Sequence, residues 1–350
     1  MTTMQAAVFH GVGPGVVVEE VPRPAPGPGE VLVEVAACGL CGTDLHYLLG
    51  EAATAKPPPI ILGHEVSGIV RELGAGATGV PVGTRVLVPP VLPCGSCRLC
   101  RSGRENICSR LRMVGNHTDG GFAEFLVAPV RDVVPLPAEL PLAESSVIAD
   151  ALSTPFHAVV NRARVQPGEW VAIVGCGGLG TGALQFAKLA GAHVIAIDLN
   201  PERLERARSL GAAVTLNPQE TDVPKEVRKI TNGGADVAME VVGSPATFTT
   251  ALATVRRGGR LCVVGYSDQA APLPLGRLMF FEEEIVGSLG CRPTDYSVIV
   301  ELVRQGRVRL EPMVTGRVGL DELGKAVESL RAGRGLRTLV VPRAAGSVLG

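Results

Sequence analysis

The chain has 350 residues, a length that suggests about two domains, and 46% of its residues are apolar, enough to form buried cores. Its 33 basic and 34 acidic residues leave a formal net charge of −1, which argues against nucleic acid or an anionic membrane as a main partner. No apolar stretch approaches the ~20 residues needed to span a bilayer. We therefore expect a soluble, cytoplasmic protein whose nine cysteines are thiols or metal ligands.

The first half of the chain consists of short β-like runs separated by Gly and Pro. The segment from Pro22 to Gly29 is an extended connection, because proline removes backbone donors and fixes φ. This pattern of short runs predicts an irregular, β-rich domain. Its expected strands are residues 16–21, 31–36, 60–69, 85–88 and 122–127.

From about Trp170 the sequence alternates between buried strands and amphipathic helices. This alternation is typical of βαβ units and a parallel sheet. The expected strands are residues 170–174, 194–197, 237–241 and 260–264, and the expected helices are residues 180–189 and 201–210. Near the C-terminus we expect helices at residues 298–304 and 320–332 and a strand at residues 338–341.

A glycine-rich turn joins the first of these strands to the next helix. The residues expected to contact the cofactor there are Gly175, Gly177, Gly178, Leu179 and Gly180. Glycines let the backbone approach a pyrophosphate, whose charge is favoured at a helix N-terminus. Asp198 ends the next strand, where a carboxylate can bind the ribose hydroxyls and repel a 2′-phosphate. The pattern favours NAD over NADP, although Arg203 could contact a ribose or a phosphate, and an ordinary strand–turn–helix without a ligand is the alternative.

Four cysteines share one short loop: Cys94, Cys97, Cys100 and Cys108. Such spacing in a cytosolic chain suits a closed tetrahedral zinc that stabilises a loop without a core of its own. Two disulfides are the alternative. Because a closed site has no open position, we expect this zinc to be structural.

Two further clusters contain possible zinc ligands, at residues 38–46 and 63–65. Each has a simpler explanation, since a single Cys is usually a small buried apolar residue. Sequence spacing alone does not bring Cys41, His64 and a distant carboxylate together.

The whole chain resembles the medium-chain zinc alcohol dehydrogenase family, which includes sorbitol and threonine dehydrogenases. The matching motifs follow the family order: Cys41-Gly-Thr43-Asp44-Leu-His46, Gly63-His64-Glu65, the four-cysteine loop, Gly120-Gly121-Phe-Ala-Glu, Asp150-Ala-Leu-Ser-Thr154-Pro and the glycine-rich turn. The resemblance implies two zinc ions per subunit and NAD as cofactors.

The resemblance also implies roles for residues at the catalytic zinc. Cys41, His64 and Asp150 would bind the ion, with Asp150 where many members have Cys. Glu65 would be able to approach the metal during ligand exchange. Asp44 would orient His64 through its other ring nitrogen.

Further residues match positions at the cofactor. Thr154 would lie against the nicotinamide, Arg337 would reach the pyrophosphate, and Gly265 is also expected to contact the cofactor. Gly42 stands where some members have a phosphate-binding Arg, so that contact is expected to be absent. Cys38 has no family role, and we expect a buried thiol.

The implied chemistry is hydride transfer from an alcohol to NAD, with zinc polarising the alcohol oxygen. Thr43 would take the hydroxyl proton and pass it through the nicotinamide ribose to His46, which faces solvent. Zinc-free quinone or enoyl reductases and non-catalytic relatives share the fold. They would lack the metal ligands or the proton relay, both of which this chain contains.

The expected substrates are secondary alcohols, cyclic alcohols and polyols. Weaker similarities suggest cyclic hydroxyacyl-CoA compounds of aromatic degradation as an alternative. These lie at residues 56–59, 88–94, 277–279 and 289–291.

The expected architecture is α/β. Residues 1–152 and 290–350 would form a GroES-like, β-rich catalytic domain. Residues 153–289 would form an inserted Rossmann domain with a doubly wound parallel sheet, and nicotinamide and zinc would meet between the two. Family members are homodimers or homotetramers, and we expect one of these here.

Overall fold

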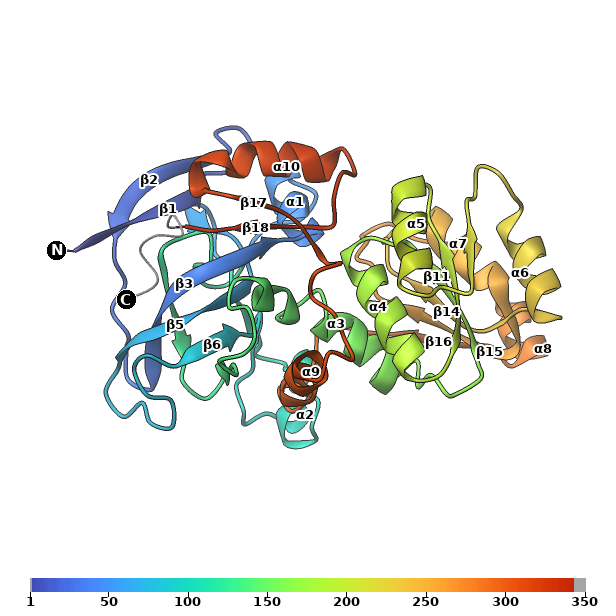
Figure 1. Ribbon diagram of the computed structural model, residues 1–350, viewed down its shortest axis with the longest axis horizontal. Helices are drawn as coiled ribbons and strands as arrows, with labels where there is room; N and C mark the ends of the chain where they lie inside the picture. The colour runs from blue at the N-terminus through green and yellow to red at the C-terminus, as the bar shows by residue number, and fades with distance from the viewer. Residues whose placement is uncertain (1, 343–350) are drawn as a thin grey trace. The chain divides into compact units, whose positions relative to one another are not determined.

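The computed structural model describes residues 2–342, which form two compact units (Figure 1). The first unit contains the described residues up to Ala151 and those from Cys291 onward, and the second is Leu152–Gly290. Both ends of the chain therefore belong to the first unit. Among residues 2–342, no helix has the length and apolarity to cross a membrane.

The first unit is rich in strands. Its largest sheet has the order β10-β6-β5-β3-β18-β17, and β9 also pairs with β3; smaller sheets are β2-β1-β4 and β7-β8. The strands are β1 (Thr3–Phe9), β2 (Val16–Pro22), β3 (Glu30–Leu40), β4 (Ile60–Ile61), β5 (Glu65–Leu73), β6 (Arg85–Val88), β7 (Val91–Leu92), β8 (Arg112–Met113), β9 (Phe125–Pro129), β10 (Val134–Pro135), β17 (Val314–Val318) and β18 (Arg337–Val340). Its helices are α1 (Gly42–Leu49), α2 (Arg98–Arg101), α9 (Asp295–Arg304) and α10 (Leu323–Arg331), with short 3₁₀ turns at Glu105–Ile107, Glu144–Ile148 and Leu320–Glu322.

A nonlocal pairing places β18, near the end of the chain, between β3 and β17 in the largest sheet. β18 runs antiparallel to β3, with Thr338 opposite Leu40. Because Leu40 directly precedes Cys41, this register places Arg337 next to the start of α1.

The expected strand at residues 60–69 is divided into β4 and β5. Gly63, between them, has φ of +93°, and a Cβ atom there would come within 2.8 Å of both Cys38 Sγ and Phe122. The break therefore depends on glycine. It places His64 directly before β5, and the Cys38 thiol fills the space against the glycine backbone.

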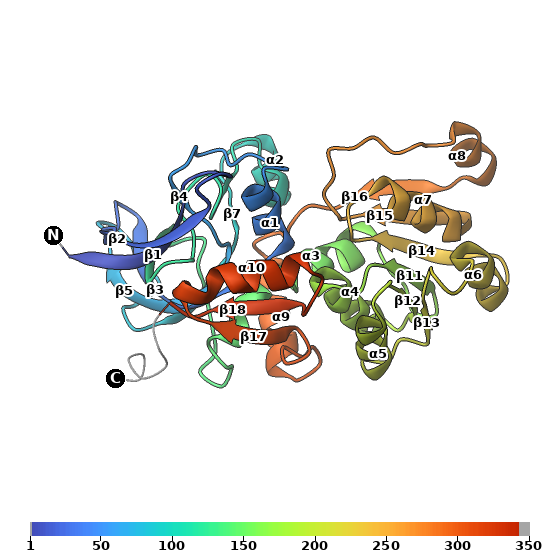
Figure 2. The same ribbon diagram turned by 90° about the horizontal axis from the view of Figure 1, so that it is seen from above.

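The second unit contains a six-stranded parallel sheet of order β13-β12-β11-β14-β15-β16, with helices on both of its faces (Figure 2). The strands are β11 (Trp170–Val174), β12 (His193–Ile197), β13 (Val214–Leu216), β14 (Ala235–Glu240), β15 (Val255–Val263) and β16 (Glu284–Gly287). The helices are α3 (Ser153–Phe156), a π-helical turn (His157–Arg162), α4 (Gly178–Leu189), α5 (Pro201–Ser209), α6 (Val223–Thr231), α7 (Pro245–Thr254) and α8 (Leu275–Phe281). This strand order defines a doubly wound Rossmann fold.

Local signals determine where the helices of this unit begin. The Asn200 side chain accepts hydrogen bonds from Glu202 N and Arg203 N, and proline occupies the first position of α5. The Asp222 side chain caps α6 through Lys225 N. Between these helices the strands are almost fully buried, as expected for a parallel sheet covered on both faces.

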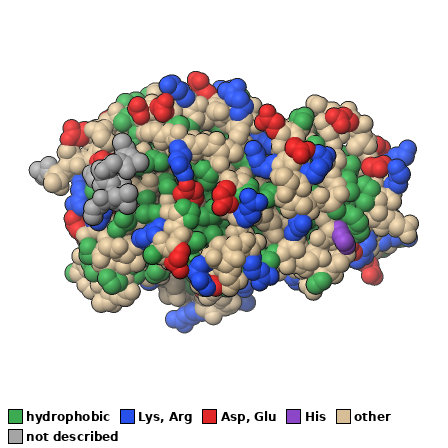
Figure 3. All heavy atoms as spheres, in the orientation of Figure 1, with side chains coloured by type: hydrophobic (Ala, Val, Ile, Leu, Met, Phe, Trp, Pro, Cys, Tyr) green, Lys and Arg blue, Asp and Glu red, His purple; other side chains and the backbone are tan. Residues whose placement is uncertain are grey.

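Acidic and basic side chains alternate over the visible face of both units without a large area of one sign (Figure 3). This distribution agrees with the net charge of −1.

Candidate functional site

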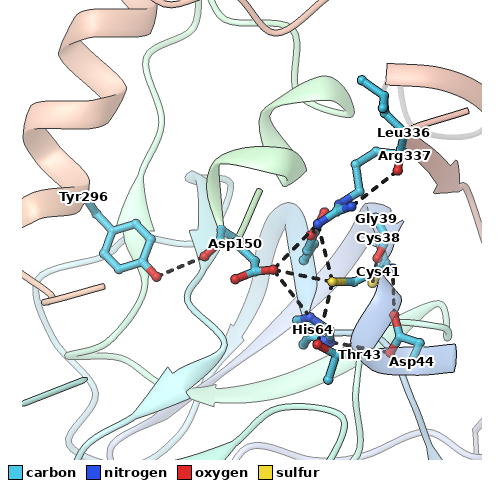
Figure 4. A network of polar contacts seen from close by, with 12 residues as sticks. Cys38, Gly39, Cys41, Thr43, Asp44, His64, Asp150, Tyr296, Leu336 and Arg337 are labelled. Atoms are coloured by element: carbon cyan, nitrogen blue, oxygen red, sulfur yellow. Dashed lines mark hydrogen bonds and ion pairs between the residues drawn. The ribbon is translucent and has the colours of Figure 1, made fainter. Parts of the chain in front are cut away.

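Three possible zinc ligands from distant parts of the chain meet within the first unit (Figure 4). Cys41 precedes α1, His64 lies between β4 and β5, and Asp150 follows the 3₁₀ turn that ends at Ile148. Asp150 Oδ2 lies 3.5 Å from Cys41 Sγ and 3.9 Å from His64 Nε2.

This donor set fits a zinc ion. With Zn–S near 2.3 Å and Zn–O and Zn–N near 2.1 Å, neighbouring donors in a tetrahedron are about 3.4–3.6 Å apart. The separations to Asp150 are at or slightly above that range. Three ligands leave a fourth position open, as a catalytic zinc requires.

Glu65 and Arg337 form a buried ion pair beside these donors. Arg337 Nε donates to Glu65 Oε1 at 2.8 Å, and its guanidinium also lies 3.4 Å from Cys41 Sγ and 3.8 Å from Asp150 Oδ2. Glu65 Oε2 is buried and has no hydrogen-bond partner among the described residues. A bare carboxylate oxygen next to three donors also suits a cation.

Asp44 contacts two of the possible zinc ligands, Cys41 and His64. Its Oδ2 accepts a hydrogen bond of 2.9 Å from Cys41 N, which caps α1, and its Oδ1 lies 3.4 Å from His64 Nδ1. The latter is a charge contact rather than an aligned hydrogen bond. It leaves His64 Nε2 facing Asp150, which suits a ring that binds metal through Nε2.

Burial and neighbouring charges act in opposite directions on these groups. Burial disfavours charge on His64, but the carboxylates of Asp44 and Asp150 outweigh it and raise the pKa of the imidazole well above its usual value. Burial raises the pKa of Glu65, although the charge of Arg337 favours its ionised form. The surroundings therefore raise the pKa of both groups.

Two residues of α1 could carry a proton, one beside the metal donors and one in contact with solvent. Thr43 Oγ1 is 3.8 Å from Cys41 Sγ, and His46 Nδ1 pairs with Glu51 Oε2 at 2.7 Å. The His46 side chain is 32% exposed, so it can exchange protons with solvent. On the same helix the Tyr47 hydroxyl accepts a hydrogen bond from Asn116 Nδ2.

The four loop cysteines form a second donor set in the first unit. The Sγ separations are 3.9 Å for Cys94–Cys100, 3.5 Å for Cys97–Cys100 and 3.7 Å for Cys97–Cys108. A tetrahedral Zn–S distance of ~2.3 Å gives edges of about 3.8 Å, whereas a disulfide would bring two sulfurs to about 2.05 Å. The separations match a four-thiolate zinc, and all nine cysteines of the chain are free thiols.

Backbone N–H groups prepare two of these thiols for metal binding. The N–H of Ser96 is the main cause that lowers the pKa of Cys94 to about 5, and the N–H of Cys100 lowers that of Cys97 to about 6. Arg110 adds a positive charge, with Nη2 3.4 Å from Cys94 Sγ.

The glycine-rich turn lies in the second unit, between β11 and α4. A Cβ atom at Gly180 would come within 1.8 Å of Gly175 O, so glycine is required for close packing of helix and strand. A Cβ atom at Gly177 would have no neighbour within 4 Å. The backbone at Gly177, at the N-terminus of α4, therefore borders open space, as a phosphate-binding turn requires.

Asp198 is fixed next to this turn. Cys176 N donates to its Oδ2 at 2.7 Å, and Asn200 N donates to its Oδ1 at 2.8 Å. Arg203 Nη1 lies 3.8 Å from the same carboxylate.

The remaining predicted cofactor residues are also in the second unit. Thr154 is buried in α3. Gly265 follows β15, where a Cβ atom would come within 2.2 Å of Gly243 N, so backbone packing already explains its glycine. Their contacts with a cofactor remain predictions.

Three contacts in and around the metal site are not predicted by the sequence. The family resemblance assigns Arg337 to the pyrophosphate, which stays a prediction, and the structure also pairs Arg337 with Glu65. Glu51 and Tyr296 were not identified as partners. For Glu51, the spacing of five residues from His46 was an available signal, but nothing in the sequence connects Tyr296 with Asp150.

Known proteins match along almost the whole chain. Residues 27–138 match the alcohol dehydrogenase GroES-like domain, and residues 178–305 match the zinc-binding dehydrogenase domain. An alcohol dehydrogenase of Geobacillus stearothermophilus is 36% identical over 333 residues, covering 95% of this chain and 96% of the relative. A sorbitol dehydrogenase of Bacillus subtilis is 36% identical, covering 93% of each chain. The cobalt- and zinc-bound alcohol dehydrogenase of Pyrobaculum aerophilum has a TM-score of 0.88 and 32% identity, covering 97% of this chain and all of the other.

The chain therefore belongs to the medium-chain, zinc-binding alcohol dehydrogenase family. It is an oxidoreductase of the alcohol dehydrogenase type, with a GroES-like domain, a Rossmann domain and donor sets that fit two zinc ions.

Proposed function

We propose that this protein oxidises a secondary alcohol, a cyclic alcohol or a polyol with NAD, reversibly, at a zinc ion held by Cys41, His64 and Asp150. The observation that carries the proposal is the convergence of these three donors in the first unit, with Thr43 beside them. A reductase without metal would have no need for this set.

The zinc would supply Lewis acidity that makes the alcohol hydroxyl easier to deprotonate. The protein's own groups then handle the proton. Thr43 would accept it and pass its own hydroxyl proton through the nicotinamide ribose to His46, which would release a proton to solvent. The carboxylate of Glu51 lies 2.7 Å from His46 Nδ1 and orients the ring.

Glu65 and Arg337 would balance the charge around the zinc ion. The buried guanidinium offsets negative charge from Cys41, Glu65 and Asp150, so the donors can be ionised together. Glu65 also provides a further oxygen when the ligands exchange.

Asp198 would select NAD in the second unit. Its carboxylate is oriented by two backbone N–H groups, so it can accept hydrogen bonds from the ribose hydroxyls and repel a 2′-phosphate.

The protein would act as a homodimer or homotetramer. Among residues 2–342, the edge strand β16 pairs with β15 alone. Beside it, α8 has no buried residue and exposes Leu275, Met279 and Phe280 by 73%, 65% and 75%. An open sheet edge next to exposed apolar side chains favours association. A reducing compartment such as the cytoplasm suits nine free thiols.

The proposal is tested by nicotinamide absorbance with secondary alcohols, cyclic alcohols, polyols and hydroxyacyl-CoA esters, each with NAD and NADP. Turnover with NAD that is lost in a chelator and restored by zinc is the expected result. Turnover unaffected by complete zinc removal would contradict the mechanism. A preference for the CoA esters would assign the second substrate class, which the residues at 56–59 and 88–94 suggest.

A further inference from the structure

Tyr296 makes a buried contact with the segment that carries Asp150. It lies on α9, is 2% exposed, and donates a hydrogen bond of 3.0 Å to the carbonyl oxygen of Ala149 (Figure 4). Ala149 directly precedes Asp150, and no step of the proposed reaction uses the tyrosine. We propose that Tyr296 is a positioning residue that fixes the backbone from which Asp150 reaches the metal. This inference rests on the proposed role of Asp150 as a ligand.

Asp150 needs such support more than the other two ligands. Its Oδ2 makes the contacts with Cys41 and His64. That oxygen is separated from the backbone by two rotatable bonds, one more than a cysteine sulfur. The side chain is also 15% exposed, against 2% for His64, so packing holds it less firmly.

The hydroxyl of Tyr296 is itself held in place. Arg292 donates two hydrogen bonds of 3.0 Å to the carboxylate of Asp295, the first residue of α9. Tyr296 follows, with its ring buried in the first unit. The chain leaves this unit after Ala151 and re-enters it at Cys291. The hydrogen bond therefore ties these two segments together next to the ligand.

The test compares holoenzyme with Tyr296→Phe, which removes the hydroxyl but keeps the ring. The zinc dissociation constant of each site is measured by competition with a chromophoric chelator. Direct partners of a ligand contribute about 10–100-fold in metal affinity. Because Tyr296 acts through a backbone carbonyl, we expect zinc to bind the catalytic site about three- to tenfold more weakly and the four-cysteine site to be unchanged.

Cobalt substitution gives a second readout. The absorption bands of the one-thiolate site are expected to shift in Tyr296→Phe, and those of the four-thiolate site are not. Ser67→Ala is the matched control, because the buried Ser67 hydroxyl donates to Leu142 O at 2.6 Å in the same segment, farther from Asp150. An equal effect of the two variants, or no effect of Tyr296→Phe, would overturn the proposal.

Asp150→Ala separates this proposal from the proposed function. It is expected to weaken the catalytic site, and adding Tyr296→Phe to it should then have no further effect. Unchanged zinc binding in Asp150→Ala would refute the ligand role itself. A full effect of Tyr296→Phe in the Asp150→Ala background would refute only the positioning role.

Discussion

Asp198 shows how one side chain can be oriented before its ligand arrives. The two N–H groups that hold it belong to Cys176, in the glycine-rich turn, and to Asn200, which caps α5. The turn and the N-cap of α5 therefore fix the carboxylate together. Such pre-organisation lowers the entropic cost of binding a ribose.

We predict that Asp198→Asn lowers the preference for NAD over NADP. The amide oxygen can still accept a backbone hydrogen bond, but the charge that repels a 2′-phosphate is gone. Losing charge-assisted hydrogen bonds worth about 1.5–3 kcal/mol should reduce the ratio of kcat/KM for NAD to that for NADP by about ten- to a hundredfold. Glu202→Gln, an equal charge change at an exposed site of α5, should leave the ratio unaltered. An unchanged ratio in Asp198→Asn would argue against the assigned role.

Asp132 is a second carboxylate with an unusual environment, in the turn after β9. Its side chain is 8% exposed, and Oδ2 has no hydrogen bond within the described chain, although Arg131 Nε lies 3.5 Å away. Burial raises the pKa of Asp132 above its usual value, against the charge of Arg131. The folded state therefore holds this proton more tightly than the unfolded state. The raised pKa lowers the free energy of unfolding. This loss is absent at pH values below the ordinary pKa of ~3.9 and complete at pH values above the raised pKa.

It follows that Asp132→Asn should raise the Tm at pH 7, where wild type bears the full penalty. The gain should shrink as the pH is lowered towards ~4, because the wild-type carboxyl then becomes neutral as well. Calorimetry at several pH values measures this difference. The exposed Asp268→Asn is the control and should give no such gain. A Tm at pH 7 equal to or below that of wild type would contradict the prediction.

At the scale of elements, the four-cysteine loop has little apolar material of its own. It contains the four-residue helix α2 and the two-stranded sheet β7-β8. A bound zinc would therefore supply most of the stability of this loop.

Cys97→Ser should accordingly reduce the zinc content from about two to about one per subunit and make the loop sensitive to proteolysis. The zinc that remains should be the one at the catalytic site. Elemental analysis and limited proteolysis measure the two effects. The control is Cys262→Ala, which removes a buried thiol from β15 and should leave both zinc ions bound. Two zinc ions in Cys97→Ser would refute the assignment.

Local patterns in the sequence predicted some elements better than others. The glycine-rich turn and the loop cysteines were recognisable because their residues lie close together along the chain. His64 was expected within one strand, because neither residue pattern nor spacing reveals that Gly63 interrupts it with a positive φ. The ligands of the catalytic zinc were predicted only by family resemblance. Arg337 reaches the metal site through the pairing of β18 with β3, a nonlocal contact that no local pattern encodes.

At the scale of the whole molecule, the sheet of the second unit ends at the edge strand β16. The segment before β16 forms α8, in which no residue is fully buried and Leu275, Met279 and Phe280 are exposed. A single copy of the chain would leave this surface in water, at a cost proportional to its apolar area. Association of two copies would remove that cost.

If the protein forms the proposed dimer or tetramer, Phe280→Glu should shift it to smaller species. A charge in the centre of an apolar contact must be desolvated, so affinity should fall by at least about tenfold, or ~1.4 kcal/mol. Sedimentation velocity over a range of concentrations measures the shift. Val12→Glu introduces the same charge at another exposed apolar residue, in the first unit, and should leave association unchanged. If Phe280→Glu and wild type sediment alike as oligomers, the subunits associate through a surface other than α8. If both sediment as monomers, the proposed association is wrong.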